Sequence, residues 1–147
     1  MPLLRSLALA LTALGLLSAC SRPDAAATGT ASGPGVAFVQ GSYEDALARA
    51  RAEKRLLLVD VYTDWCGWCK KLDREVFGDA RVAEAARRLV AVRVDAEKEG
   101  EEVARRFDVE GYPTVLFVDG SGSVVKRVEG FVDVDEMLRI LASLPQT

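Results

Sequence analysis

Two of the three cysteines in this 147-residue chain, Cys66 and Cys69, stand three positions apart in the segment WCGWCK at residues 65–70. If a helix starts at the first cysteine, this spacing brings the two Cα atoms within the ~4.4–6.8 Å that a disulfide needs. Cys66 then lies at the helix N-terminus, where unpaired N–H groups stabilise a thiolate, and Cys69 lies sheltered one turn further in. An exposed nucleophile beside a sheltered resolving thiol is what thiol–disulfide exchange requires. The segment therefore predicts redox chemistry on these two sulfurs.

Other uses of the cysteine pair compete with redox exchange. A purely structural disulfide is a poor fit, because closing so short a loop removes little entropy from the unfolded chain. A zinc site would need further ligands, and the chain has no His and no second Cys pair to complete a tetrahedral shell. A two-thiolate Cu(I) site stays open as an alternative, because soft sulfur ligands suit that ion. We expect no resident metal and no cofactor.

Composition narrows the remaining functions. The 19 Lys+Arg and 22 Asp+Glu leave a net charge of −3, which argues against the concentrated basic face that binds nucleic acid. The absence of His removes imidazole acid–base catalysis and nucleophile pairs that depend on His. A chain of 147 residues that is 50% hydrophobic can bury the core of one globular domain. We expect a monomer that acts on proteins.

The N-terminus is typical of an exported protein. Residues 1–5 are a short cationic start, and residues 7–17 form an almost wholly apolar run that is too short to span a bilayer. The sequence LSAC at residues 17–20 resembles the bacterial lipobox, in which the Cys thiol is lipidated and the chain is cut before it. We therefore expect residues 1–19 to be a lipoprotein signal peptide and Cys20 to carry lipid. An ordinary signal peptide with a stray Cys is the alternative.

Lipidation of Cys20 would leave the other two cysteines as an even pair in an oxidising compartment. Ser21, directly after it, indicates sorting to the outer rather than the inner membrane. Residues 20–35 are rich in Ala, Gly, Ser, Thr and Pro, which predicts a flexible tether that reaches roughly 20 Å. The folded domain is then residues 36–147, lipid-anchored in the cell envelope and facing the periplasm.

Residues 36–147 alternate strand and helix patterns in the manner of an α/β domain. Residues 56–62 are apolar except for Asp60, which predicts a strand buried on both faces, and DGSG at residues 119–122 predicts a hairpin. The expected strands are residues 36–39, 56–62, 89–94, 114–118 and 123–128, and the expected helices begin near residues 42, 66, 79, 99 and 133, with Ser42, Asp79 and Asp133 as N-caps. The order β-α-β-α-β-α-β-β-α predicts parallel strands joined by helices, with an antiparallel hairpin at one side.

Three motifs resemble the thioredoxin family: Val59-Asp60 ahead of the cysteines, the WCGWCK segment, and GYPT at residues 111–114 ahead of the hairpin. The resemblance runs from residue 36 to residue 144. It is greatest to exported bacterial thioredoxin-like proteins, including the C-terminal domain of the membrane thiol-reductant transporter DsbD. It implies the thioredoxin fold, an α/β architecture with a central mixed sheet, helices on both faces, and a C-terminal β-hairpin plus helix.

The resemblance also implies roles for Asp60 and Pro113, which join Cys66 and Cys69 as the expected catalytic residues. Asp60 matches the family's buried acid beneath the resolving Cys; burial raises the pKa of such a carboxyl, which can take the proton of Cys69. A solvated Asp at a strand end is the alternative. Pro113 matches the family's cis-proline, which lies against the disulfide and presents the preceding backbone to substrate. A trans turn proline is the alternative.

The expected substrate-binding residues are Trp65, Gly67, Trp68, Tyr112 and Thr114. The two Trp side chains would form an apolar surface beside the thiols that contacts the client protein, and Tyr112 would border the groove in which the client docks. We expect Trp68 to be the more exposed of the two, whereas Trp65 could pack partly into the core.

Two departures from the family bear on the chemistry. Gly67-Trp68 stands where the strong periplasmic oxidant of the family has Pro-His, which predicts a more reducing pair. Ala91 stands near the position of a strand lysine often found beside the buried acid, which leaves the size of the Asp60 effect open.

The sequence thus predicts an envelope thiol:disulfide oxidoreductase that reduces protein disulfides through a dithiol–disulfide cycle of Cys66 and Cys69. Electrons would arrive from a membrane thiol-reductant transporter and leave to misoxidised proteins or apocytochrome thiols. A disulfide oxidase or isomerase is the alternative within this class. A thioredoxin-fold binding module without enzymatic activity, Cu(I)-binding in one version, is the alternative from another class.

Overall fold

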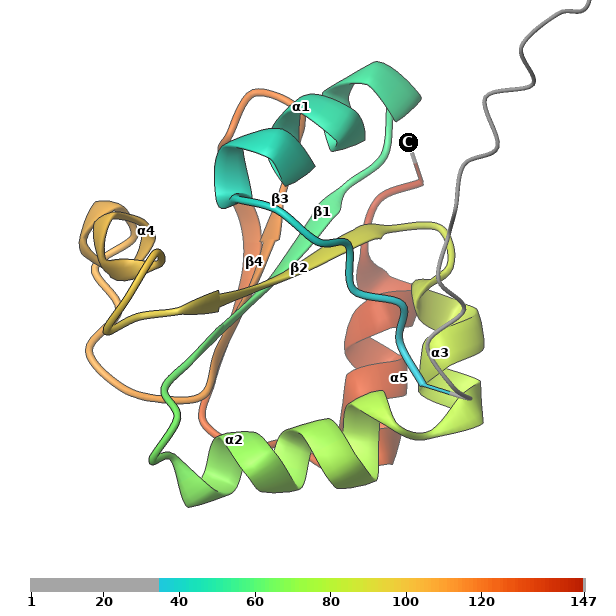
Figure 1. The fold of residues 1–147 in the computed structure, drawn as a ribbon. Helices are drawn as coiled ribbons and strands as arrows, with labels where there is room; N and C mark the ends of the chain where they lie inside the picture. Colours follow the sequence, from blue (N-terminus) through green and yellow to red (C-terminus); the bar gives the residue numbers. More distant parts are fainter. Residues whose placement is uncertain (1–34, 147) are drawn as a thin grey trace, which may run out of the picture.

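The computed structural model describes residues 35–146 (Figure 1). The expected signal peptide at residues 1–19, the lipidation site Cys20 and residues 20–34 of the expected tether lie outside the described residues, as does Thr147. Within the described range, no helix has the length and apolar character needed to cross a membrane.

The helices and strands follow the predicted order after the first predicted strand. They are α1 (Tyr43–Glu53), β1 (Leu57–Tyr62), α2 (Gly67–Leu72), the π-helical turn η1 (Asp73–Phe77), α3 (Ala80–Ala86), β2 (Val90–Asp95), α4 (Glu101–Arg106), β3 (Thr114–Val118), β4 (Val124–Glu129) and α5 (Val134–Ser143). The predicted caps are confirmed: Ser42, Asp79 and Asp133 each accept a backbone N–H in the first turn of their helix.

The strands form one mixed sheet in the order β2-β1-β3-β4. The two strands β1 and β2 are parallel, and the other neighbouring pairs, β1 with β3 and β3 with β4, are antiparallel. The hairpin predicted at residues 119–122 joins β3 to β4, where the backbone N–H of Gly122 donates to the carbonyl of Asp119 at 3.0 Å. This confirms the predicted mixed sheet with an antiparallel hairpin at one side.

The strand predicted at residues 36–39 is wrong in extent, because only an isolated parallel bridge between Phe38 and Ala91 forms there. Gly41, at φ +121°, turns the chain three residues later into the N-cap of α1. The segment therefore ends before it can add a full strand beside β2. Phe38 still packs edge-on against Phe77, with ring centroids 5.2 Å apart.

Helices cover both faces of the sheet (Figure 1). One face packs against α2, η1, α3 and α5, where Leu58 and Phe117 of the sheet share a cluster with Leu72 of α2. The other face packs against α1 and α4 and contains Val59 and Leu116. Successive residues of a strand point to opposite faces. Asp60 therefore shares a face with Leu58, beneath the helix that follows the first cysteine.

Candidate active site

The two cysteines of the WCGWCK segment lie at the start of α2 and form a disulfide. Cys66 is the N-cap of the helix and Cys69 is in its first turn, with the Cα atoms 5.3 Å apart and the sulfurs 2.17 Å apart. The Sγ atom of Cys66 also accepts a hydrogen bond from the backbone N–H of Cys69 at 3.0 Å. The predicted placement of the two residues across a helix start is therefore confirmed.

The expectation that Cys66 is exposed while Cys69 is sheltered is wrong for this oxidised form. The exposed fractions are 4% for Cys66 and 3% for Cys69. In this disulfide form the two cysteines are therefore buried to almost the same extent.

A short turn after β1 sets where α2 begins. The strand ends at Tyr62, and the backbone N–H of Cys66 donates to the carbonyl of Thr63 at 3.1 Å, which closes the turn. Gly67 follows as the first helical residue, and a Cβ atom there would meet nothing within 4 Å. Gly67 is exposed and therefore leaves open space at the start of α2, between the two cysteines in the chain.

Asp60 is a buried acid, as expected, with only 1% of its surface exposed. Its Oδ2 atom accepts a hydrogen bond from Nε of Arg93 at 3.0 Å, whereas its Oδ1 atom has no hydrogen-bond partner among the described residues. Burial raises the pKa of Asp60 to about 6; the Arg93 charge opposes this rise and the charge of Asp73 adds to it. The solvated alternative is excluded.

Arg93 supplies the cation beside the buried acid, and the sequence analysis missed it. It stands two residues after Ala91 on β2, on the same face of the strand, and it lies opposite Asp60 in the parallel β1–β2 register. Ala91 does not supply the positive charge of the family's strand lysine. Arg93, two residues further along β2, supplies a positive charge beside Asp60 instead. The alternation of side chains along a strand would place Arg93 on the same face as Ala91, but only the register between two distant segments identifies its partner.

The peptide bond between Tyr112 and Pro113 is cis, which is the geometry that the resemblance implies. The neighbouring Thr114 donates from Oγ1 to the carbonyl of Gly111 at 2.8 Å. The carbonyl of Pro113 accepts the backbone N–H of Gly130 at 2.8 Å, which ties this loop to the end of β4. The trans alternative is excluded.

Aromatic side chains flank the cysteine pair on the surface. Trp65 and Trp68 are 66% and 59% exposed, so Trp65 does not pack into the core and Trp68 is not the more exposed of the two. The Trp65 ring meets Tyr112 edge-on at 6.2 Å, and the Trp68 ring lies 5.6 Å from Phe131. Lys71 places its Nζ over both Trp68 and Phe131, at 5.2 and 4.7 Å from the ring centroids. The sequence analysis did not include Phe131, because it is distant from the cysteines in the chain.

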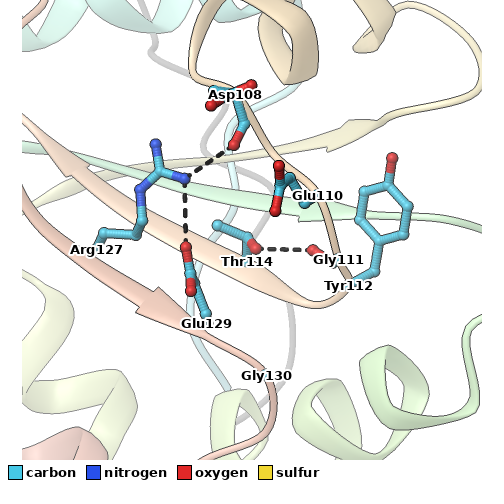
Figure 2. Close-up of a pocket in the computed structure, with 8 residues that line it drawn as sticks. All are labelled: Asp108, Glu110, Gly111, Tyr112, Thr114, Arg127, Glu129 and Gly130. Atoms are coloured by element: carbon cyan, nitrogen blue, oxygen red, sulfur yellow. Dashed lines mark hydrogen bonds and ion pairs between the residues drawn. The ribbon is translucent and has the colours of Figure 1, made fainter.

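An open cavity of about 420 Å³ adjoins the loop that contains Tyr112 (Figure 2). It is lined by Asp108, Glu110, Gly111, Tyr112, Thr114, Arg127, Glu129 and Gly130. Arg127 spans it, donating from Nη1 to the carbonyl of Asp108 at 3.2 Å and to Oε1 of Glu129 at 3.5 Å. Two of the predicted binding residues, Tyr112 and Thr114, therefore lie together at one hollow of the surface.

No group of three or more Cys, Asp or Glu side chains among residues 35–146 has the arrangement of a metal site. The Cys66–Cys69 pair therefore has no further ligand of these types gathered around it in this structure.

Comparison with known proteins points to one family. The family model of the thioredoxin-like domain matches residues 43–145. The thiol:disulfide interchange protein DsbD of Pseudomonas fluorescens is 36% identical over 101 residues, which is 65% of this chain and 17% of that protein. The chain thus spans about a sixth of the length of this relative.

Solved structures agree with the family model. A proposed disulphide-isomerase from Bacteroides thetaiotaomicron is 40% identical with a TM-score of 0.65, over 76% of this chain and 97% of that one. The reduced C-terminal domain of DsbD from Neisseria meningitidis is 26% identical with a TM-score of 0.57, over 67% of this chain and 90% of that one.

Proposed function

The chain belongs to the thioredoxin-like family and carries a dithiol–disulfide pair on Cys66 and Cys69, and we propose that it works as a reductase of protein disulfides. The observation that carries the proposal is the disulfide at the start of α2, with Cys66 as the N-cap. A sulfur at this position has an N–H group directed at it and is favoured as a thiolate.

The proposed cycle transfers two electrons to the client protein. In the reduced form, the Cys66 thiolate attacks one sulfur of a client disulfide, and the other client sulfur leaves as a thiolate. Cys69 then loses its proton and attacks Sγ of Cys66, which breaks the bond to the client. The client leaves as a dithiol after protonation, and the disulfide of this structure is regenerated.

Asp60 is the proposed acceptor of the Cys69 proton. Burial raises its pKa to about 6, so the carboxyl is mostly ionised at neutral pH yet is a stronger base than an exposed carboxylate. It shares its face of the sheet with Leu58, which packs in the same cluster as Leu72 of α2, the helix that contains Cys69.

The proposed docking surface lies around the disulfide. Trp65, Gly67, Trp68, Tyr112 and Thr114 are assigned to client binding, and Pro113 is assigned to the catalytic group, where it would present backbone to an extended client segment. The exposure of both indole rings and the cavity beside Tyr112 support this assignment.

The proposed location is the periplasmic side of the bacterial envelope. Residues 1–19 would be a lipoprotein signal peptide, Cys20 would carry the lipid, residues 20–35 would be the tether, and residues 36–147 would be the catalytic domain. The outer membrane is the proposed site because Ser21 follows Cys20. Loss of metabolic lipid labelling in Cys20→Ser, measured against the wild type, would support this anchor, and unchanged labelling would overturn it.

The proposed partners follow from the similarity to DsbD. A membrane thiol-reductant transporter would donate electrons, and misoxidised proteins or apocytochrome thiols would accept them. The protein would act as a monomer, without nucleic acid and without a bound cofactor.

Reduction of insulin disulfides tests the proposed activity. The wild type should precipitate the insulin B chain in the presence of a thiol reductant, and Cys66→Ala should be no faster than the uncatalysed reaction. Equal rates for the two proteins would favour a binding module instead. The reduction potential then separates a reductase from an oxidase or isomerase, because an oxidising pair has a potential nearer to that of the strong oxidants, about −120 mV.

A further inference from the structure

Arg93 is held by contacts with four side chains. Its Nε donates to Oδ2 of Asp60 at 3.0 Å, and its Nη1 donates to Oδ1 of Asp73 at 2.8 Å. The guanidinium carbon also lies over the rings of Phe38 and Tyr62, at 5.2 and 4.9 Å from their centroids. A planar guanidinium that binds two carboxylates and stacks on aromatic rings has little freedom to turn.

Because Arg93 is held in this way, the two carboxylate oxygens of Asp60 differ in their hydrogen bonding. Arg93 approaches from β2 and engages Oδ2, while its Nη1 is directed away to Asp73 at the start of η1. The Oδ1 atom of Asp60 is buried and has no hydrogen-bond partner among residues 35–146. A buried acceptor without a donor destabilises the fold, so an oxygen left in this state calls for an explanation, and a role in proton transfer is one.

The surroundings of Asp60 contain few groups that could interact with Oδ1. The charged groups that act on its carboxyl are Arg93 from β2 and Asp73 from η1. Its neighbour on β3 is Val115, which is apolar and fully buried. Helix α2 packs on this face through Leu72, and the same helix contains Cys69, whose side chain is buried.

We infer that Arg93 is a positioning residue for the second half of the thiol–disulfide cycle: it binds Oδ2 of Asp60 and leaves Oδ1 as the oxygen that takes the proton of Cys69. The inference rests on the proposed function, because it concerns the resolution of a mixed disulfide on Cys66. It assigns a role to a residue that is not part of the cysteine segment or the Pro113 loop.

The proton on Sγ of Cys69 moves to Oδ1 of Asp60, and the electron pair left on that sulfur attacks Sγ of Cys66. The bond between Cys66 and the client breaks, the client sulfur leaves as a thiolate, and the cysteine pair becomes the disulfide. Arg93 keeps its proton throughout.

Asp73 completes the arrangement. When Asp60 becomes neutral, Arg93 would lose its counter-ion at that end, but its second N–H group remains bound to Asp73. Asp73 is 47% exposed at its side chain, so it remains in contact with solvent. Arg93 is therefore held in place in both protonation states of Asp60.

The two steps of the cycle can be timed separately with Ellman's reagent, using reduced protein in excess over the reagent. The first coloured thiolate is released by Cys66 and the second by Cys69, and the second phase is intramolecular, so its rate does not depend on protein concentration. Both phases are followed against pH for the wild type, Arg93→Met, Arg93→Lys and Asp73→Asn. Arg49→Met is the matched control, because Arg49 pairs with Glu53 on the outside of α1.

In the wild type, the second phase should rise with pH around a midpoint near 6, where Asp60 titrates. Arg93→Met removes the charge that lowers the pKa of Asp60, so its midpoint should move up by about one pH unit or more, which slows resolution about tenfold below the midpoint. Arg93→Lys keeps a positive charge at this position, so its midpoint should lie between those of the wild type and Arg93→Met. Asp73→Asn should move the midpoint down, because it removes a negative charge. The first phase should be the same in all of them.

A second-phase profile that is the same in Arg93→Met, Asp73→Asn and Arg49→Met would overturn the inference. If Arg93→Met does not fold, as judged by circular dichroism, Asp73→Asn decides alone, since its side chain lies at the surface. Failure of the proposed function has a different signature: the first phase would then persist unchanged in Cys66→Ala.

Discussion

The Sγ atom of Cys66 accepts the backbone N–H of Cys69 at 3.0 Å, so the first sulfur of the redox pair is also the N-cap of α2. The same N–H group is present after the disulfide is reduced, and it then faces a thiol that can ionise. A hydrogen bond to the charged form, together with the positive end of the helix dipole, lowers the pKa of a thiol at this position. Cys69, inside the first turn, has no such donor at its own sulfur in this structure.

The two thiols should therefore differ in reactivity. In the reduced protein at neutral pH, iodoacetamide should label Cys66 on the order of tenfold faster than Cys69, because the thiolate is the reacting form. Peptide mapping by mass spectrometry after short exposures gives the two rates. Labelling of both residues at the slow rate of an ordinary thiol would contradict the proposed roles.

Removal of the resolving thiol should trap clients. Cys69→Ala should accumulate mixed disulfides on Cys66, since no neighbouring thiolate is left to displace the client. Non-reducing electrophoresis of envelope fractions followed by mass spectrometry identifies the trapped proteins. The double variant Cys66→Ala/Cys69→Ala is the control. If it gave adducts in equal yield, the trapping would not depend on Cys66, and the proposed role of Cys66 would be wrong.

Asp60→Asn should slow the second phase of the reaction with Ellman's reagent at neutral pH and leave the first phase unchanged. An amide cannot accept the Cys69 proton, and general acid–base contributions of this kind are typically 10²–10⁴-fold. Stopped-flow measurement at pH 7 separates the phases. An unchanged second phase would remove Asp60 from the mechanism.

Asp60 should also make stability depend on pH. Burial raises its pKa from 3.8 in the unfolded chain to about 6 in the folded protein, so the folded state binds the proton more tightly between these values. The contribution of this carboxyl to the free energy of unfolding therefore falls as pH rises from about 4 to 6, by roughly 3 kcal/mol, and is constant above that.

Asp60→Asn has no such titration. Its free energy of unfolding relative to the wild type should rise across this pH window, as measured by urea denaturation at pH 4 and pH 7.5. A difference between the two proteins that does not change with pH would mean that the carboxyl of Asp60 is not shifted by burial.

Trp68 should contribute to client affinity rather than to thiol chemistry. Its side chain is 59% exposed and lies against Phe131, so Trp68→Ala should raise KM for a protein disulfide roughly five- to thirtyfold, as expected for 1–2 kcal/mol at an interface hot spot. Rates with Ellman's reagent should be unchanged. Val125→Ala, at an exposed position on β4, is the control. Equal KM values for the two variants would exclude Trp68 from the docking surface.

Much of the fold could be predicted because its signals are local. The apolar run around Asp60 predicted a buried strand, the caps at Ser42, Asp79 and Asp133 marked helix starts, and the DGSG segment marked the hairpin. The Cys66–Cys69 spacing predicted a pair across a helix start for the same reason, since three residues of helix bring the positions together. The strand at residues 36–39 failed because its pairing with β2 is a long-range contact that only one bridge satisfies.

The sequence by itself determined which side chains could do the chemistry: two thiols at a helix start and one carboxyl inside an apolar strand. The tertiary structure alone decided what surrounds them. The parallel register of β1 and β2 brings Arg93 to Asp60, and the packing of the β4–α5 loop brings Phe131 to Trp68. Tertiary packing also leaves Cys66 almost as buried as Cys69. The physical reason is the distance along the chain over which each kind of interaction acts. Residue spacing and periodicity reflect contacts within one or two helical turns, whereas strand register and packing depend on contacts between segments that are far apart in the sequence.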